Sequence, residues 1–405
     1  MQSIQEIFKI GPGPSSSHTF GPMRACEYIL KNVPEANSFI VTLYGSLALT
    51  GKGHLTDMII KKTLSPHPCE IRMDLKAECK HPNTMCIEAY HDDTFLESHT
   101  FVSIGGGQIE IDNTPIKPAK HVYPHSTLDE IQAYCQEHKI RLDEYIDTFE
   151  DESLKPYMNS IFQMMLKCVR QGLKKTGVLP GKLKLERVAH ALHQSAKACL
   201  DPQDKNSLLL SSYAYAASEQ NASGQLVVTA PTMGSCGVLP SLLYHYYYDL
   251  KYPKKTLIQG LKVAGLIGDL IQTNATISGA KAGCQAEVGA ACSMGAAFVA
   301  FCQTQTNEQI ECAAEIGLEH HLGLTCDPVG GYVMIPCIER NAVASQRSID
   351  AARLARYIRN VKKNRVSFDM VVKTMNMTGN KLPIELKESA LGGLAVVVPN
   401  EPQDD

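Results

Sequence analysis

Apolar residues recur with a helical period along most of the chain after residue 125. The clearest example is the stretch 256–272, whose apolar positions form a stripe broad enough to predict a central, largely buried helix. The same period marks residues 126–137, 154–174 and 185–200, and residues 287–301 are dominated by alanine and glycine, which lets helix backbones approach closely. This pattern predicts one mostly α-helical domain.

The first third of the chain shows a shorter period. Residues 39–44 are β-branched or aromatic and are followed by a glycine, which is typical of a strand. Residues 86–90 and 97–102 alternate between apolar and polar positions on either side of a turn-like segment. Residues 19–31 carry a helical pattern with Gly-Pro near its start. The mix predicts an α+β domain with an antiparallel sheet.

A change of character near residue 120 separates the two patterns. Lys117, Pro118 and Pro124 mark a linker there. A chain of 405 residues is long enough for two domains. We therefore expect an α+β domain over residues 1–122, followed by a mostly helical domain over residues 123–405.

Composition narrows the class of protein. Hydrophobic residues make up 44% of the chain and charged residues 20%, as in ordinary soluble globular proteins. The net charge of -3 and the lack of a basic run argue against a nucleic-acid partner. The N-terminus lacks the apolar run of a signal peptide, and no window approaches the roughly 20 apolar residues of a membrane span. We expect a cytoplasmic protein.

Fourteen cysteines without a signal sequence argue against a disulfide framework. Those in apolar, helix-like contexts are expected to be inert packed thiols, namely Cys168, Cys199, Cys302 and Cys312. Three others are flanked by Gly, Pro and acidic residues, which is an unusual context for a packed thiol: Cys284, Cys326 and Cys337.

These three cysteines could hold a metal centre and leave one coordination position open, which is where metal chemistry takes place. Their spacing of 42 and 11 residues is by itself a weak signal, because zinc knuckles and ferredoxins show short C-x2-C pairs. The residues around each cysteine carry the specificity.

A serine-rich segment precedes the first predicted helix. Ser15, Ser16, Ser17, His18 and Thr19 follow a Gly-Pro-Gly-Pro turn, so hydroxyls and free N–H groups gather at a helix N-terminus. Such a terminus makes a good cradle for an anion. The alternative is an ordinary N-cap serine, but the density of polar groups exceeds what capping needs.

Further candidates follow two predicted strands. Ser46, Lys52 and His54 lie in a loop that resembles a phosphate loop only superficially, since a glycine follows the lysine where Ser or Thr is required. His54 could equally be a half-buried structural histidine. Thr229 and Thr232 lie in a second loop, typical of anion contact.

The second loop also contains Cys236, which we favour as a packed thiol over a fourth metal ligand. Asn274 and Lys281 lie shortly before Cys284 and are further substrate-binding candidates. Lys281 could equally be a solvated surface charge.

The surroundings of these residues resemble the iron–sulfur L-serine dehydratases (L-serine ammonia-lyases) in their fused, single-chain form. The resemblance covers nearly the whole chain. It is carried by motifs in one order: Gly-Pro-Ser-Ser-Ser-His-Thr at 13–19, Thr-Ala-Pro-Thr at 229–232, Gly-Cys-Gln-Ala-Glu-Val-Gly at 283–289, Leu-Thr-Cys-Asp-Pro-Val at 324–329, Pro-Cys-Ile-Glu-Arg-Asn at 336–341 and Leu-Gly-Gly-Leu-Ala at 391–395.

The resemblance implies a 4Fe-4S cluster on Cys284, Cys326 and Cys337, an α+β domain fused to a cluster-bearing helical domain, and a homodimer. It implies a small amino-acid substrate and a place in amino-acid degradation and gluconeogenesis. The open iron would act as a Lewis acid on the carboxylate and β-hydroxyl of L-serine.

The reaction that the resemblance implies needs a base, which the sequence does not identify. His18 and His54 are the first candidates for the base that removes the α-proton, and Lys52 is a further catalytic candidate. Ser15, Ser16, Ser17 and Thr19 would hold the carboxylate. Water would then leave, and the product would hydrolyse to pyruvate and ammonia.

The chain departs from the family in four places. Fused members usually end in a cysteine that ligates the cluster until substrate arrives, whereas Asn400 stands near that point here, so water, the Asp405 carboxylate or nothing would hold the fourth iron. Met233 replaces a common Asn. Lys281 places a cation where a neutral or acidic residue is usual, and could receive an extra anionic group on a substrate. The N-terminal domain is also shorter than is common.

Three alternatives remain at this point. The same cluster could eliminate sulfide from L-cysteine or act on a related 2-amino-3-hydroxy acid. The chain could be a non-catalytic sensor that keeps the cluster. A pyridoxal-phosphate lyase with Lys281 as Schiff base is disfavoured, because no matching phosphate loop accompanies it.

Overall fold

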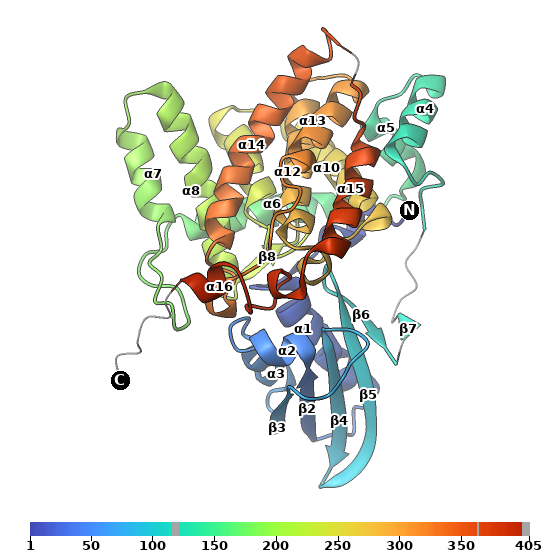
Figure 1. Ribbon diagram of the computed structural model, residues 1–405, viewed down its shortest axis with the longest axis vertical. Helices are drawn as coiled ribbons and strands as arrows, with labels where there is room; N and C mark the ends of the chain where they lie inside the picture. The colour runs from blue at the N-terminus through green and yellow to red at the C-terminus, as the bar shows by residue number, and fades with distance from the viewer. Residues whose placement is uncertain (113, 116–120, 363, 399–405) are drawn as a thin grey trace.

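The computed structural model describes residues 1–112, 114–115, 121–362 and 364–398 and has two parts (Figure 1). A sheet with three short helices forms the lower part in that view, and a larger helical body lies above it. The predicted α+β part followed by a mostly helical part is confirmed. The predicted linker residues Lys117 and Pro118 lie outside the described residues, and the boundary at 122/123 stays a prediction.

The sheet has six strands in the order β3-β2-β4-β5-β6-β7. All neighbouring pairs are antiparallel except β2 and β3, which are parallel. The parallel pair arises because α2 and α3 intervene and carry the chain back to the same edge. The strands are β2 (Ser38–Tyr44), β3 (Cys69–Asp74), β4 (Thr84–His91), β5 (Thr94–Gly105), β6 (Gln108–Ile111) and β7 (Thr114–Pro115).

The sheet buries one face under helices. Along β2 the side chains of Phe39, Val41 and Leu43 are buried and alternate with half-buried neighbours, as the period of a strand requires. They pack in a core with residues of α1 and α3. The helices of this part are α1 (Gly21–Asn32), α2 (Gly45–Thr50) and α3 (Thr56–Leu64).

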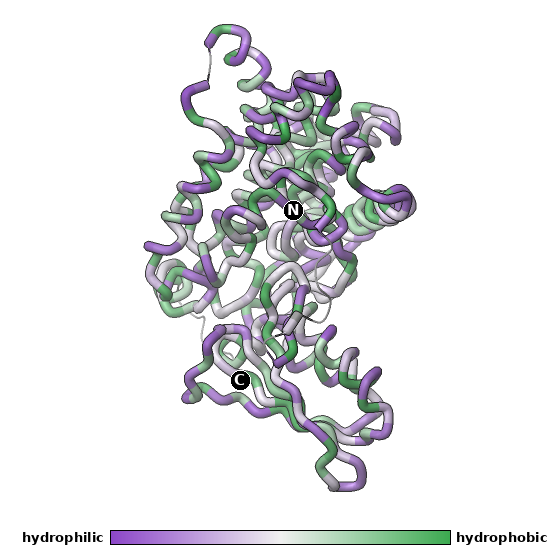
Figure 2. The backbone as a smooth tube through the Cα atoms, turned by 90° about the vertical axis from the view of Figure 1, so that its right-hand side faces the viewer, coloured by the Kyte–Doolittle hydropathy of each residue, from purple (hydrophilic) through white to green (hydrophobic). Residues whose placement is uncertain are grey.

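The helical body contains the predicted helices with small shifts at their ends. Figure 2 shows green apolar segments running through its middle and purple polar segments at its outer loops. Its longer helices are α4 (Leu128–His138), α5 (Leu142–Phe149), α6 (Leu154–Gly172), α7 (Ala189–Ala198), α8 (Pro202–Ala222), α10 (Lys254–Asn274), α12 (Val288–Cys302), α13 (Asn307–Glu319), α14 (Cys337–Ile358) and α15 (Phe368–Lys381). The shorter ones are α9 (Val238–Tyr244), α11 (Gly279–Ala282) and α16 (Leu394–Val397).

The centre of this body is α12, all of whose residues are buried. Its small residues let neighbouring helices come close: a Cβ added at Gly295 would lie 2.5 Å from Ser348 Oγ on α14. The stretch Cys284–Cys302 is apolar and long enough to cross a membrane, contrary to the expectation from sequence, because its many small residues raise hydropathy without a visibly apolar run. Since 94% of that stretch is buried by protein, it is the core helix of a globular fold.

The N-terminal residues belong to the helical body. Ile4, Ile7 and Phe8 are fully buried in its core, and β1 (Ile10–Pro12) pairs antiparallel with β8 (Leu226–Val228). The chain then passes into the sheet part through a π-helical turn, η2 (Ser16–Phe20), which continues into α1. The serine-rich segment therefore lies at the junction of the two parts.

Candidate active site

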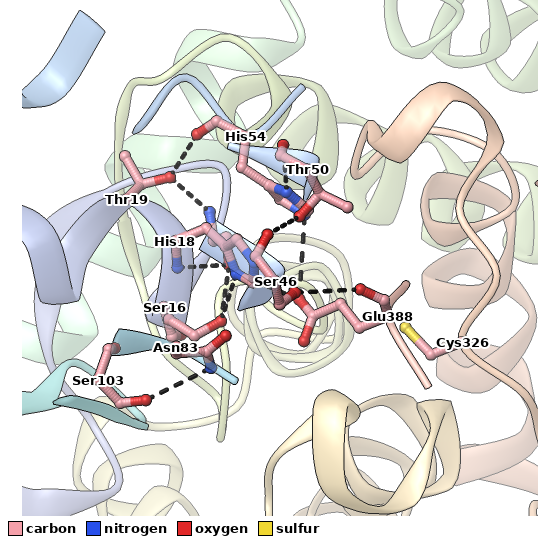
Figure 3. A network of polar contacts seen from close by, with 12 residues as sticks. Ser16, His18, Thr19, Ser46, Thr50, His54, Asn83, Ser103, Cys326 and Glu388 are labelled. Atoms are coloured by element: carbon pink, nitrogen blue, oxygen red, sulfur yellow. Dashed lines mark hydrogen bonds and ion pairs between the residues drawn. The ribbon is translucent and has the colours of Figure 1, made fainter. Parts of the chain in front are cut away.

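A small cavity lies at the junction between the sheet part and the helical body. Residues from six separate segments line it, which explains why no single motif reveals it. The lining consists of Pro14, Ser15, His54, Gly234, Glu287, Cys326, Pro328, Val333, Cys337 and Glu388. Figure 3 shows part of this network, with His18, His54 and Glu388 close together and Cys326 beside them.

Two histidines from the sheet part stack on one side of the cavity. The rings of His18 and His54 lie 4.3 Å apart and 29° from parallel, and both side chains are fully buried. His54 Nδ1 lies 3.1 Å from the carbonyl oxygen of Thr50. A carbonyl only accepts hydrogen bonds, so Nδ1 carries the proton and Nε2 carries the lone pair. Burial lowers the pKa of His54 to about 4, which keeps Nε2 unprotonated at neutral pH.

The N-terminal serines and Ser46 hold His18. Its backbone N–H donates to Ser15 Oγ at 3.1 Å, which caps the π-helical turn. Ser46 Oγ lies 3.0 Å from Nε2 of the His18 ring, and Ser17 Oγ lies 2.8 Å from Nδ1. Burial, and then the neighbouring His54, lower the pKa of His18 well below its usual value. The two histidines thus form a neutral, fixed pair.

Glu388 faces both histidines and is a site residue that the sequence did not reveal. Its Oε1 lies 3.8 Å from His18 Nδ1 and 3.9 Å from His54 Nε2. Burial, and then the charge of Glu287, raise the pKa of Glu388 well above its usual value. A lone acidic residue in an irregular segment carries no periodicity; the one available signal is its place three residues before the Leu-Gly-Gly motif.

Backbone hydrogen bonds tie Glu388 to one of the cysteines. The N–H of Glu388 donates to the carbonyl oxygen of Cys326 at 2.7 Å, and the N–H of Cys326 donates to the carbonyl oxygen of Leu386 at 2.8 Å. A φ of 55° at Glu388 turns the chain there. This C-terminal segment therefore brings its carboxylate to the cysteines and to the histidines together.

The three predicted cysteines come together from separate segments. Cys284 opens the short turn before α12, Cys337 is the first residue of α14, and Cys326 lies between them in sequence. Burial raises the pKa of the Cys284 thiol to about 11, although the nearby Arg340 guanidinium acts to lower it. Burial, Glu287 and the other thiols raise the pKa values of Cys326 and Cys337 well above the usual value.

The residues around the cysteines fit a cationic group. Three thiols and a carboxylate placed together repel one another when ionised, whereas a bound metal deprotonates its thiol ligands outright. Gly279 keeps a side chain away from these donors, because a Cβ added there would lie 2.7 Å from Glu287 Oε2 and 3.5 Å from Cys326 Sγ. The donor type therefore suits a thiolate-bound metal centre.

Glu287 connects the cysteines with the second hydroxyl loop. Thr232 Oγ1 donates to Glu287 Oε1 at 2.8 Å, and the Cys326 thiol lies 3.9 Å from Glu287 Oε2. Burial raises the pKa of Glu287. Thr232 thus acts through Glu287 and is absent from the cavity lining within the described residues.

Several other predicted substrate contacts have structural partners. Ser16 Oγ accepts the N–H of Met233 at 2.8 Å, and Thr19 Oγ1 donates to the carbonyl oxygen of His54 at 2.7 Å. Thr229 Oγ1 donates to the carbonyl oxygen of Ile7 at 2.7 Å and accepts the N–H of Lys9, which fixes the N-terminal segment. These hydroxyls position the site and are occupied by backbone partners.

Three predicted residues lie away from the cavity as far as the structure describes the chain. Lys52 and Lys281 are exposed. Asn274 is exposed at the end of α10 and donates to the carbonyl oxygens of Ser126 and Leu270. Their polarity and position in loops made them candidates, but the local backbone turns them outward.

The tail and the remaining cysteines complete the picture. Asn400 and Asp405 lie outside the described residues. Cys236 and Met233 are buried in an apolar cluster that also contains Cys168. Cys302 and Cys312 are also buried, and Cys199 is half-buried.

Comparisons with known proteins agree with this geometry. The family model for the serine dehydratase beta chain matches residues 3–76, and that for the alpha chain matches residues 70–395, so the two meet within β3. L-serine dehydratase 1 of Escherichia coli (strain K12) is 37% identical, across 98% of this chain and 99% of its own length. The L-serine dehydratases of Haemophilus influenzae (36%; 98% and 99%) and Helicobacter pylori strain 26695 (38%; 97% and 98%) are similar to the same extent. The chain therefore belongs to the serine dehydratase family, with the beta-type and alpha-type regions joined in one polypeptide.

Proposed function

We propose that this chain is an L-serine ammonia-lyase that converts L-serine to pyruvate and ammonia with a 4Fe-4S cluster. One observation carries the proposal: Cys326, Cys337 and His54 line one small cavity, and Cys284 and His18 lie directly behind them. The names of the relatives above support L-serine as substrate.

Cys284, Cys326 and Cys337 are the residues that would hold the cluster. When bound, it supplies a Lewis acid that polarises the substrate carboxylate and hydroxyl. Arg340 offsets part of the negative charge of the thiolates, since its guanidinium interacts with Cys284 and Cys337. The start of α14 at Cys337 adds the positive end of a helix dipole.

His54 is the base in this proposal. Its Nε2 bears a lone pair, borders the cavity and lacks a hydrogen-bond partner among the described residues. The Thr50 carbonyl fixes the tautomer and holds the ring in place. His54 Nε2 would take the α-proton of the substrate, while His18 packs against its face and limits movement.

Ser15 is the hydroxyl best placed for the substrate carboxylate. It lines the cavity at the beginning of the helical run formed by η2 and α1. Ser16 already accepts the N–H of Met233, and Ser17 contacts the His18 ring. Ser15 Oγ accepts the N–H of His18 and still has its own hydrogen to donate to a carboxylate at this helix N-terminus.

Two assays test the proposal. Protein purified without oxygen should be brown and should form pyruvate from L-serine faster than from L-cysteine or L-threonine. Cys326→Ala should abolish the cluster absorbance, whereas the matched variant Cys236→Ala, in a packed thiol, should retain it. Colourless protein, or an intact cluster in Cys326→Ala, would refute the ligand assignment. Faster release of sulfide from L-cysteine than of pyruvate from L-serine would show that L-cysteine is the substrate.

We further propose that the chain is a cytoplasmic homodimer. This follows the family resemblance, and sedimentation at micromolar concentration tests the oligomeric state. A monomer would contradict it.

A further inference from the structure

Three potential metal ligands converge beside the cysteines. One ring nitrogen of His18, one of His54 and one carboxylate oxygen of Glu388 all lie within 4.8 Å of one another (Figure 3). All three side chains are buried, and none comes from the cysteine-bearing loops. Two of them come from the sheet part and one from the C-terminal segment.

The hydrogen bonds of both rings leave one nitrogen of each ring without a proton. His54 donates its Nδ1–H to Thr50, and its Nε2 is a buried nitrogen without a hydrogen-bond partner in the described part of the chain. The Ser46 hydroxyl donates to the carbonyl oxygen of Glu388 at 3.4 Å, which leaves Ser46 Oγ to accept from His18 Nε2 at 3.0 Å. His18 Nδ1 is then the unprotonated nitrogen.

This arrangement matches that of metal-binding histidines. Such residues usually donate their second ring N–H to a carbonyl or another acceptor, which fixes the tautomer and the ring. Here Thr50 and Ser46 provide those two acceptors. Ser17 Oγ lies 2.8 Å from His18 Nδ1 and 3.2 Å from Ser15 Oγ. Ser17 can therefore donate to Ser15 instead, which leaves His18 Nδ1 available to a metal ion.

The distances suit a small divalent ion. Tetrahedral ligands at about 2.1 Å from zinc lie about 3.4 Å apart. The two distances from Glu388 Oε1 to the histidine nitrogens are 3.8 and 3.9 Å. Rotation about the Glu388 side chain would shorten both distances by about 0.5 Å, and a bound ion would also have to draw together the two histidine nitrogens, which lie within 4.8 Å of each other.

We propose that His18, His54 and Glu388 form a binding site for one divalent transition-metal ion such as Zn²⁺, distinct from the three cysteines. Two imidazoles and one carboxylate suit zinc or ferrous iron and leave one coordination position for water. An ion held there occupies the lone pair of His54. If His54 is the base of the proposed lyase, the ion inhibits the enzyme.

Zinc titration of a chain without the three cysteine ligands tests the site directly. In Cys284→Ser/Cys326→Ser/Cys337→Ser protein, competition with a chelator should reveal one tightly bound Zn²⁺ per chain. Adding Glu388→Gln or His54→Asn should weaken that binding at least tenfold. The matched control Glu287→Gln removes a carboxylate of the same cavity that is not among the three ligands, and should weaken binding less than Glu388→Gln does.

Unchanged affinity in the Glu388→Gln protein, or equal weakening by Glu287→Gln, would overturn the proposal. Because this variant lacks the cysteines, the zinc titration does not depend on whether the wild-type protein binds a cluster or forms pyruvate. Should the triple variant not fold, zinc-edge X-ray absorption of cluster-loaded wild-type protein decides. Nitrogen and oxygen neighbours at about 2.0–2.2 Å support the site, whereas sulfur at about 2.3 Å or no bound zinc refutes it.

Discussion

Asp269 makes the stability of the fold depend on pH in a direction that can be measured. It lies on α10 with a fully buried side chain, and its Oδ2 lacks a hydrogen-bond partner within the residues that the structure describes. Burial raises its pKa to about 7, although the N-terminal amino group acts to lower it. The unfolded chain has the ordinary value of 3.8.

The raised pKa means that the folded state holds a proton that the unfolded state has already released. Protonated Asp269 therefore contributes to the free energy of unfolding at low pH, and this contribution is lost as pH rises toward about 7. Over the two pH units between pH 5 and pH 7, the loss in the free energy of unfolding is at most about 2.7 kcal/mol, at 1.36 kcal/mol per unit. Asp269→Asn, which cannot ionise, should not show this loss.

Equilibrium denaturation by urea at pH 5, 6, 7 and 8 measures the effect. The free energy of unfolding of wild type minus that of Asp269→Asn should fall by about 2–3 kcal/mol between pH 5 and pH 8, since other titrating groups cancel in the difference. Asp350→Asn, which removes an exposed carboxylate, is the control and should give a flat difference. A flat difference for Asp269→Asn would refute the reasoning.

Three further changes have defined outcomes. His54→Asn should lower the kcat for pyruvate formation by about 10²–10⁴-fold while the cluster absorbance persists, and near-normal turnover would exclude His54 as the base. Gly295→Ala should destabilise the fold by about 1–3 kcal/mol in urea, because the added Cβ would lie 2.5 Å from Ser348 Oγ; unchanged stability would show that the helices can separate without cost. Thr229→Val should cost about 1–3 kcal/mol by removing partners of Ile7 and Lys9, and Thr229→Ser should restore most of it.

The sequence predicted what depends on local pattern. The helix over 256–272 appears as Lys254–Asn274, because its apolar stripe has the helical period and meets the core. The three cysteines were singled out because unusual neighbours surround each thiol, and the structure brings all three together, while their role as ligands stays a prediction. The parallel pairing of β2 with β3 was missed, since it depends on the path of the chain between them rather than on either strand.

The misplaced and missed site residues show the limit of such patterns. Lys52 and Asn274 have suitable chemistry, yet the direction of a side chain in a loop depends on backbone turns that composition does not specify. Glu388 lies 342 residues from Ser46, whose hydroxyl contacts it. Only the tertiary fold brings those two together.

The pairing of β1 with β8 has a mechanical consequence. The first residues of the chain are anchored inside the helical body, and the Met1 amino group donates to the carbonyl oxygen of Tyr123 at 2.7 Å, beyond the sheet part. The sheet part is thus an insertion whose two ends are both fastened to the same body. It cannot rotate about a single connection as a terminal domain can. Access to the buried cavity therefore requires local shifts of the segments around Ser15 and Glu388.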